Sequence, residues 1–373
     1  MSISNLTKAT LFLCISAGTW LGSIPAAELV FRLLGDKPSP DMRGLFAPFA
    51  NGGYRLGASV DTYAFYARGL VTVHTDSLGL RCDRARGFAA KPGEAVDALL
   101  LGDSQGFGNG VDFEESIAGT LARILAEEGY RVCNASVGGH SIADQFELAR
   151  WLVEEQRLKV ANFVVLLTPV MIFTGNKLDH AIVGHDGRLY ADSVGLGTLL
   201  NLWAKTHLVI YSRVRDAVRG CGIGIDPAKG STSVFEFYQV RKQQDAVLPD
   251  LLAGVKRLQV FASANGAAIH LVYVPLIVEA DFDLVQQAAA KTGIELDPDT
   301  PLRIASSVAE RLHVPLYDLK PVLKKVRAEG HRLNVEGDFH YSPVLSCASG
   351  SSLAVRLKQA LGKTQVAKIR LRR

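Results

Sequence analysis

The sequence predicts an α/β fold in which helices cover both faces of a mostly parallel sheet. From about residue 95 onward, short apolar runs alternate with longer amphipathic segments. The runs are continuously apolar, which is typical of strands that are buried on both faces. With 373 residues, 48% of them apolar, the chain is long enough to bury such a core. Parallel neighbours need helical crossovers, and these place helices on both sides of the sheet.

The first expected element is an uncharged stretch near the N-terminus, ATLFLCISAGTWLGSIPAA at residues 9–27. About 20 apolar residues suffice for a helix to cross a bilayer. Small residues are poorly placed for cleavage, so we expect residues 1–34 to be an uncleaved transmembrane anchor. This predicts attachment to the cell membrane with the remaining domain outside the cytoplasm. A cleaved signal peptide and a buried helix remain alternatives, and the flanking charges indicate the orientation only weakly.

Residues 35–94 are expected to form a connector and a small strand-rich segment. The stretch at 35–53 is rich in glycine and proline, and the following residues contain β-branched and aromatic runs broken by Gly and Asp. Such runs between turn residues are typical of short strands.

Residues 95–362 are expected to form the main α/β domain. In chain order we expect a strand at 97–102, a helix at 114–129, a strand at 130–136, a helix at 141–158 and a strand at 161–170. Residues 170–245 break the alternation and predict an insertion or a helical cap. It resumes with a helix at 249–266, a strand at 269–276, a further helix, a strand at 313–319 and a last helix at about 344–361.

Composition excludes several function classes. The net charge of +4 comes from the tail at 363–373, which holds five basic and no acidic residues, and the rest of the chain has a net charge of −1. We therefore expect no nucleic-acid partner and a solvated tail. The five cysteines are scattered, which indicates neither a disulfide scaffold nor a zinc site. Asp179, His180 and His185 lack a third ligand at suitable spacing, so we expect no metal.

The stretch LLLGDSQGFGNGV at 99–111 ends a buried strand on a glycine-rich turn that presents Ser104. Such a turn suits either a phosphate-binding loop or a serine nucleophile. The glycine spacing differs from GxGxxG, and the loop has neither a GK[ST] sequence nor any lysine. Nucleotide binding is therefore disfavoured, and we expect no cofactor.

A serine nucleophile needs a general base and donors for the developing oxyanion. The segment NASVGGHS places Gly139 just after the second strand, where its backbone N–H is unobstructed. The segment EGDFHYSP places Asp338 and His340 just before the last helix, so that the carboxylate can orient the imidazole. In a parallel sheet these loops meet at the carboxyl ends of the strands.

These three blocks, GDSQGFGNGV, NASVGGHS and DFHYSP, together resemble the SGNH/GDSL hydrolase superfamily over roughly residues 70–362. The stretches AAELVFRLLG and VHTDSLGLRCD also resemble its membrane-anchored bacterial members. The resemblance implies a flavodoxin-like three-layer α/β/α sandwich. It implies Ser104 as nucleophile, His340 as base and Asp338 as its orienting partner, with the N–H groups of Ser104 and Gly139 as oxyanion donors.

The third block of that family has an asparagine after the third strand, and this chain departs from the pattern. Thr168 and Pro169 stand at the strand end, and Asn176 follows several residues later. We expect Asn176 to act as a third oxyanion donor through a longer loop. Asp103 is expected to hold the nucleophile turn, Asn134 to tie a strand end to a neighbouring loop, and His140 to line a pocket or the surface.

The resemblance implies a serine esterase that acts on acyl or acetyl esters, with a carbohydrate or a lipid as the candidate carrier of the acyl group. Two other functions remain open. An O-acyltransferase of the same fold would pass the acyl group to a sugar hydroxyl, and a catalytically silent scaffold would only bind a glycan or a partner. The sequence does not indicate an oligomeric state.

Overall fold

The computed structural model of the chain describes residues 23, 25–33, 44–49, 53–66, 69–85, 87–174, 182–183, 189–190, 200, 203–204, 208–211, 237–239, 244–290, 296–335 and 338–371. The chain divides into two compact units. The smaller comprises residues 1–41 and 193–227, and the larger comprises residues 42–192 and 228–373.

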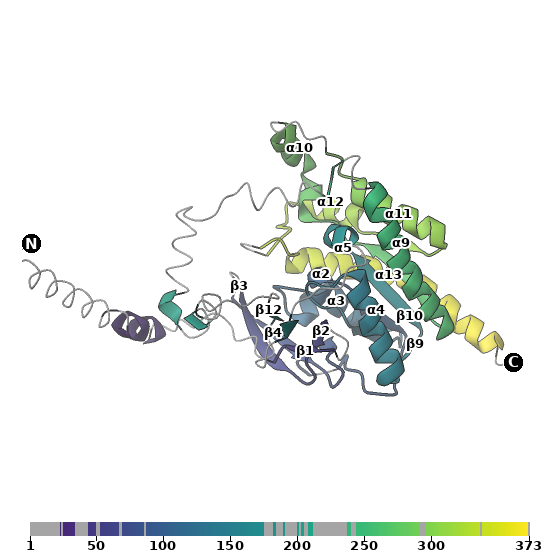
Figure 1. Cartoon of the computed structure of the whole chain (residues 1–373), viewed down its shortest axis with the longest axis horizontal. Coiled ribbons are helices and arrows are strands. Elements are labelled where there is room, and N and C mark those ends of the chain that lie inside the picture. Colours follow the sequence, from purple (N-terminus) through teal and green to yellow (C-terminus); the bar gives the residue numbers. More distant parts are fainter. Residues whose placement is uncertain are drawn as a thin grey trace, which may run out of the picture. The chain divides into compact units, whose positions relative to one another are not determined.

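An eight-stranded sheet forms the centre of the larger unit (Figure 1). Its spatial order is β14 (Leu316–Asp318), β13 (Ala268–Tyr273), β10 (Asn162–Leu167), β7 (Ala98–Leu101), β8 (Val132–Asn134), β5 (Arg81–Cys82), β4 (Gly69–Thr75) and β3 (Asp61–Tyr66). The strands from β14 to β8 are parallel, and β5, β4 and β3 continue the sheet in antiparallel fashion. In chain order the parallel strands lie 2-1-3-4-5, which is the flavodoxin-like order. The prediction of a mostly parallel sheet is confirmed.

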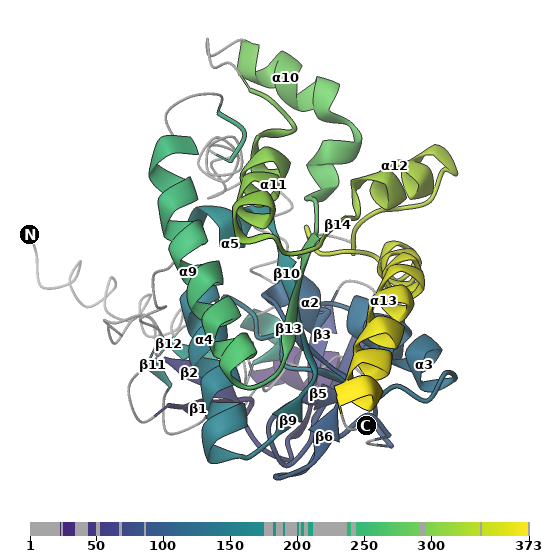
Figure 2. The ribbon, with the colours of Figure 1, turned by 90° about the vertical axis from the view of Figure 1, so that its right-hand side faces the viewer.

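Helices cover both faces of this sheet (Figure 2). One face is covered by α4 (Ile142–Arg150), α9 (Gln244–Ala264) and α11 (Thr300–Leu312), and the other by α3 (Ile117–Ala126), α12 (Lys320–Ala328) and α13 (Pro343–Leu371). Shorter elements are β1 (Phe46–Pro48), β2 (Tyr54–Leu56), β6 (Ala95–Val96), β9 (Lys159–Val160), β11 (Ile182–Val183), β12 (Leu189–Tyr190), α2 (Ser104–Phe107), α5 (Pro169–Thr174), α10 (Phe282–Ala290), η1 (Phe113–Glu115), η2 (Trp151–Glu155) and η3 (Ile277–Ala280).

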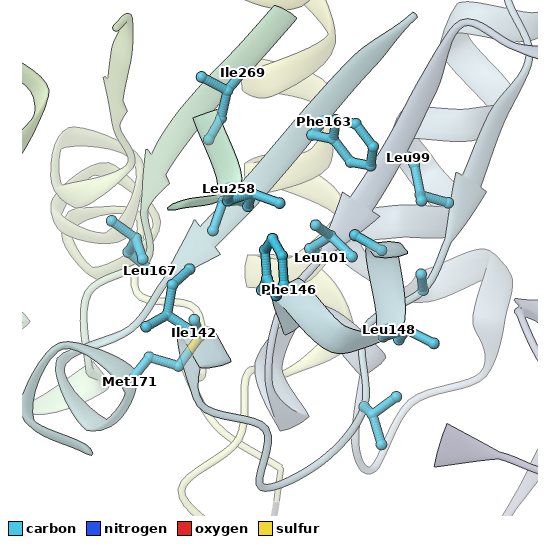
Figure 3. Close-up of a cluster of buried hydrophobic side chains, with 14 of the residues drawn as sticks. Leu99, Leu101, Ile142, Phe146, Leu148, Phe163, Leu167, Met171, Leu258 and Ile269 are labelled. Atoms are coloured by element: carbon cyan, nitrogen blue, oxygen red, sulfur yellow. The ribbon is translucent and has the colours of Figure 1, made fainter. Parts of the chain in front are cut away.

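The central strand β10 shows why both faces need covering. Successive side chains of a strand point to opposite faces, so Phe163 and Leu167 pack toward α4 and α9 (Figure 3). Val164 and Leu166 enter the core on the other side, with α3 and α13. Burying each such side chain stabilises the fold by roughly 1.5–3 kcal/mol.

Several elements differ from the sequence-based expectation. The strands β3, β4 and β5 extend the central sheet instead of forming a separate small element. The predicted helix at 141–158 ends its α-helical part at Arg150 and continues as a π-helical turn over η2. Helix α12 was not predicted, although Pro321 near its start is a helix-initiating signal.

In the smaller unit residues 25–33 are helical, and the Glu28 carboxylate accepts the N–H groups of Val209 and Ile210 at 3.1 and 2.9 Å. The expected anchor falls largely on residues 1–22 and 24, which lie outside the described residues, so it stays a prediction. Among the helices in the described ranges, none combines the length and apolar character that crossing a membrane requires.

In the larger unit, the last helix continues to Leu371, ten residues past its expected end.

Candidate active site

The nucleophile turn begins where β7 ends. Asp103 is the N-cap of the short helix α2, and its carboxylate accepts the N–H of Gln105 at 2.9 Å. Ser104 is the first residue of this helix and is partly exposed, while its neighbours on both sides are buried. Gly108 ends the helix with φ +84°, a left-handed conformation that favours glycine. The turn therefore projects one hydroxyl from an otherwise buried loop.

Gly106 lets this turn pack closely against the sheet. A Cβ at this position would lie 2.6 Å from Ser136 Oγ and 2.8 Å from Leu166 Cδ1, so a larger residue here would require these side chains to move. The side chain of Asn134, at the end of β8, donates to Gly106 O at 3.1 Å. This contact agrees with the expectation that Asn134 ties a strand end to a neighbouring loop.

Ser104, His340 and Asp338 form a continuous chain of hydrogen bonds. His340 Nε2 lies 2.8 Å from Ser104 Oγ, and His340 Nδ1 lies 2.7 Å from Asp338 Oδ1. Because a carboxylate only accepts, Nδ1 carries the proton, and Nε2 is left to accept the serine hydroxyl proton. The structure thus brings together three residues that lie up to 236 positions apart. We refer to them below as the triad.

Asp338 is held in its ionised form. Burial opposes its charge, but His340 and the backbone N–H groups of Phe339 and His340 outweigh burial and lower the pKa of Asp338. The Phe339 N–H donates to Asp338 Oδ1 at 2.6 Å. Asn334 donates from its side chain to Asp338 O at 2.7 Å. The loop is therefore tied at the carboxylate residue itself, which orients the imidazole.

Gln105 was not singled out from the sequence, yet it connects the two halves of the triad. Its side-chain Oε1 accepts the Tyr341 N–H at 3.2 Å, and its Nε2 lies 3.5 Å from Phe339 O. These contacts bracket His340 on both sides along the chain. The available signal was a polar residue directly after the nucleophile, in a turn that is otherwise rich in glycine.

Asp103 differs from Asp338 in its surroundings. It is 5% exposed, and burial raises its pKa despite hydrogen bonds from the Thr168 hydroxyl and the Gln105 N–H. The Thr168 Oγ1 lies 2.5 Å from Asp103 Oδ2. The sequence-based expectation that Asp103 holds the turn agrees with these contacts.

The backbone N–H groups of Ser104 and Gly139 are the two that the sequence predicts as oxyanion donors. Among the described residues, none accepts a hydrogen bond from the N–H of Ser104 or Gly139. Gly139 is exposed and has φ +85°. A Cβ built on the preceding Gly138 would lie 3.7 Å from Ser104 Cβ, so this glycine pair flanks the nucleophile.

The third block contributes no side-chain donor at the strand end. Thr168 follows β10 directly, and its hydroxyl is engaged by Asp103 and by the Met171 N–H at 3.2 Å. The expected donor Asn176 lies outside the described residues. Its role therefore stays a prediction.

Arg81 holds the glycine-rich loop that follows α2. Its guanidinium is fully buried and donates to Phe107 O, to Gly108 O at 2.8 Å and to Val111 O at 2.7 Å. It also stacks over the Phe107 ring, with its central carbon 4.4 Å from the ring centre. The buried Arg81 side chain, which belongs to the antiparallel strand β5, therefore stabilises this loop by hydrogen bonds to its carbonyl groups.

His140 was expected to line a pocket or the surface, and its burial excludes the surface placement. It is 1% exposed, its Nε2 lies 2.8 Å from Tyr54 O, and its ring meets the Tyr54 ring edge-on at 5.0 Å. The strand β2 therefore covers the loop that carries Gly139. Sequence gave no sign of this contact, because Tyr54 and His140 are 86 residues apart.

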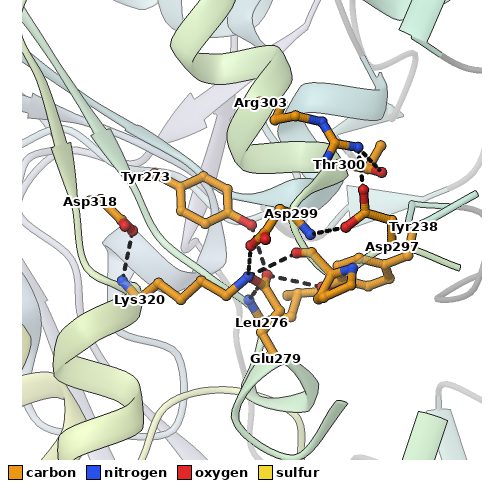
Figure 4. Close-up of polar contacts among 11 residues, drawn as sticks. Tyr238, Tyr273, Leu276, Glu279, Asp297, Asp299, Thr300, Arg303, Asp318 and Lys320 are labelled. Atoms are coloured by element: carbon orange, nitrogen blue, oxygen red, sulfur yellow. Dashed lines mark hydrogen bonds and ion pairs between the residues drawn. The ribbon is translucent and has the colours of Figure 1, made fainter. Parts of the chain in front are cut away.

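A second polar cluster lies beyond the ends of β13 and β14 (Figure 4). We call it the Glu279 cluster: Glu279, Lys320, Tyr238, Tyr273 and Asp299. Glu279 Oε1 accepts the hydroxyls of Tyr238 and Tyr273 at 3.0 and 2.8 Å, and Oε2 lies 3.2 Å from Lys320 Nζ. Lys320 also contacts Asp299 at 2.7 Å. Burial tends to lower the pKa of Lys320, but its carboxylate partners outweigh burial and raise it.

Within the described ranges no three His, Cys, Asp or Glu side chains gather as metal ligands would. Asp179, His180 and His185 lie outside those ranges.

No protein-family model matches the chain, and no curated protein does. Similar solved structures include one titled TesA, at 17% identity over 69% of this chain and 97% of the other, with a TM-score of 0.35. Another is a putative lipolytic protein of the G-D-S-L family from Desulfitobacterium hafniense DCB-2, at 14% identity over 69% and 98% of the two chains, TM-score 0.36. A third is the acetyl xylan esterase AlAXEase, at 15% identity over 71% and 99%, TM-score 0.37.

Proposed function

We propose that the protein is a serine ester hydrolase in which Ser104 is the nucleophile, His340 the general base and Asp338 its orienting partner. The observation that carries the proposal is the chain of two short hydrogen bonds from Ser104 Oγ through the imidazole to Asp338 Oδ1. A serine hydroxyl becomes nucleophilic when a neutral base accepts its proton.

In the proposed reaction Ser104 Oγ attacks the ester carbonyl, and its proton moves to His340 Nε2. The negative charge develops on the former carbonyl oxygen, beside the N–H groups of Ser104 and Gly139. The C–O bond then breaks, and the imidazolium returns the proton to the departing alcohol. Water, deprotonated by the same imidazole, hydrolyses the acyl-enzyme and regenerates Ser104.

The substrate class is acyl or acetyl esters, with a carbohydrate or a lipid as the candidate carrier of the acyl group. The partly exposed Ser104 and the exposed Gly139 support access of a ligand to this edge of the sheet. The acyl-enzyme could instead pass its acyl group to a sugar hydroxyl. Incubation with an acyl donor and a free sugar separates the two reactions, because a hydrolase releases the acid and a transferase forms an acylated sugar.

The decisive experiment is Ser104→Ala, assayed on a short-chain p-nitrophenyl ester. We expect kcat/KM to fall at least about 10³-fold with an unchanged thermal midpoint, since the hydroxyl is removed without creating a buried cavity. A fluorophosphonate should label the wild type and not the variant. The matched control is Ser349→Ala, which removes a buried hydroxyl in α13 that has no hydrogen-bond partner among the described residues. Wild-type activity in Ser104→Ala would refute the proposal and would favour the silent scaffold.

A further inference from the structure

Tyr54 joins the short β1–β2 hairpin to the loop that carries the candidate oxyanion donor. Its side chain is 1% exposed, and its hydroxyl donates to Gly138 O at 2.9 Å. The ring packs edge-on against His140 at 5.0 Å and against Phe46 at 5.6 Å. The hydroxyl is thus held by a ring that is itself immobilised.

The carbonyl that accepts this hydrogen bond belongs to the same peptide group as the Gly139 N–H. The bond is trans, since the described residues contain no cis peptide, and a planar trans peptide directs its C=O and N–H in opposite directions. Holding the carbonyl toward Tyr54 therefore directs the N–H away from the hairpin. Ser104 lies beside this peptide group, because a Cβ on Gly138 would come within 3.7 Å of Ser104 Cβ.

The turn needs an external restraint because its own residues supply little. Gly138 and Gly139 have no side chains, and glycine loses more conformational freedom on ordering than any other residue. The hairpin provides a second tie at His140, whose Nε2 donates to Tyr54 O at 2.8 Å. Tyr54 therefore contacts the turn on both sides of the Gly139 N–H, once by its side chain and once by its backbone.

We propose that Tyr54 is a positioning residue for the oxyanion site: its hydroxyl fixes the Gly138–Gly139 peptide so that the Gly139 N–H points at the developing oxyanion. The inference rests on the proposed esterase function. Donors that are oriented before the reaction stabilise the transition state without reorganisation. A hydrogen bond at the carbonyl also polarises the amide and strengthens its N–H as a donor.

The test is Tyr54→Phe, which removes only the hydroxyl and leaves the ring in place. Deleting an oxyanion donor costs about 10²–10³ in kcat. Loosening one costs less, so we expect about a 10-fold fall in kcat with KM within about twofold. The affinity for a boronic acid that mimics the tetrahedral intermediate should fall by the same factor as kcat. The pH dependence of kcat/KM should keep its midpoints, because the triad is untouched.

The matched control is Tyr273→Phe, which removes a fully buried hydroxyl that donates to Glu279 at 2.8 Å in the Glu279 cluster. It should lower the thermal midpoint and leave kcat and boronate affinity unchanged. A second variant, His140→Leu, removes the other tie of the same turn and should also lower kcat several-fold. Wild-type kcat and boronate affinity in both Tyr54→Phe and His140→Leu, with Ser104→Ala inactive, would overturn the inference and leave the esterase proposal standing. Full activity in Ser104→Ala would overturn the esterase proposal itself.

Discussion

The triad and the Glu279 cluster both lie at the carboxyl edge of the same sheet, yet they use charge differently. Glu279 is 2% exposed and is surrounded by two hydroxyls, a backbone N–H and an ammonium group. The triad instead ends at Ser104, a partly exposed residue. A polar cluster whose groups are bonded to one another stabilises a fold. One that leaves a nucleophile directed at solvent is able to do chemistry.

The largest expected effect breaks the triad at its carboxylate. In Asp338→Asn the amide can offer an N–H to His340 Nδ1, which favours the wrong tautomer, and it cannot stabilise the imidazolium. We expect kcat to fall by about 10²–10⁴-fold. Steady-state kinetics on the p-nitrophenyl ester measure this fall. The control is Asp299→Asn, which removes a carboxylate partner of Lys320 and should leave kcat unchanged. Equal losses in both variants would abolish the distinction between the two clusters.

A stability effect of about 3–5 kcal/mol is expected when the Glu279 cluster loses its cation. Lys320→Met leaves the Glu279 carboxylate buried beside no ammonium group, which is costly. Urea unfolding measures the change, and kcat/KM of the folded protein should stay within about threefold. The double variant Lys320→Met/Glu279→Gln should recover part of the loss. A single variant as stable as the wild type would show that the ion pair contributes nothing.

The smallest expected effect concerns pH and the two carboxylates of the active site. Burial raises the pKa of Asp103 in the folded state above 3.8. The folded state therefore keeps this proton to a higher pH than the unfolded state does. Asp103 consequently lowers the stability of the fold as pH rises from 3.8 through the raised value. Asp338 has a lowered pKa and adds stability above 3.8 that is lost as pH falls through the lowered value.

Thermal midpoints of Asp103→Asn and Asp338→Asn, compared with the wild type from about pH 3 to about pH 7, check these opposite signs. The thermal midpoint of Asp103→Asn should rise relative to that of the wild type as pH rises. The thermal midpoint of Asp338→Asn should fall relative to that of the wild type over the same range. Parallel curves for the two variants would mean that their surroundings do not differ in the way described.

Local patterns in the sequence were sufficient to predict the layers of the fold and to name the three residues of the triad. Continuous apolar runs predicted the parallel strands, and the loop positions of a hydroxyl, a carboxylate and an imidazole predicted that these three side chains would meet. Their chemistry stays a prediction. The joining of β3, β4 and β5 to the sheet was not predicted, because edge pairing depends on contacts between distant segments. The boundaries of the expected domains, at residues 34, 94 and 362, stay predictions.

Residues that act through backbone groups were missed for the same reason. Tyr54 bonds to a carbonyl 84 positions away, and Arg81 bonds to the carbonyls of a loop 26 to 30 positions away. A carbonyl acceptor requires no particular partner residue, so such contacts leave no pattern in the sequence. Only the triad, whose chemistry restricts the residue types, could be predicted by residue number.

The strand order has a consequence for the timing of synthesis. Ser104 directly follows the end of β7, which comes first in the chain among the parallel strands of the central sheet, whereas His340 lies in the loop before the last helix, 236 residues later. A nascent chain therefore exposes a hydroxyl that has no base until nearly all of the protein has left the ribosome. On the proposed mechanism, any product truncated before residue 340 lacks the general base, and we expect it to have no esterase activity.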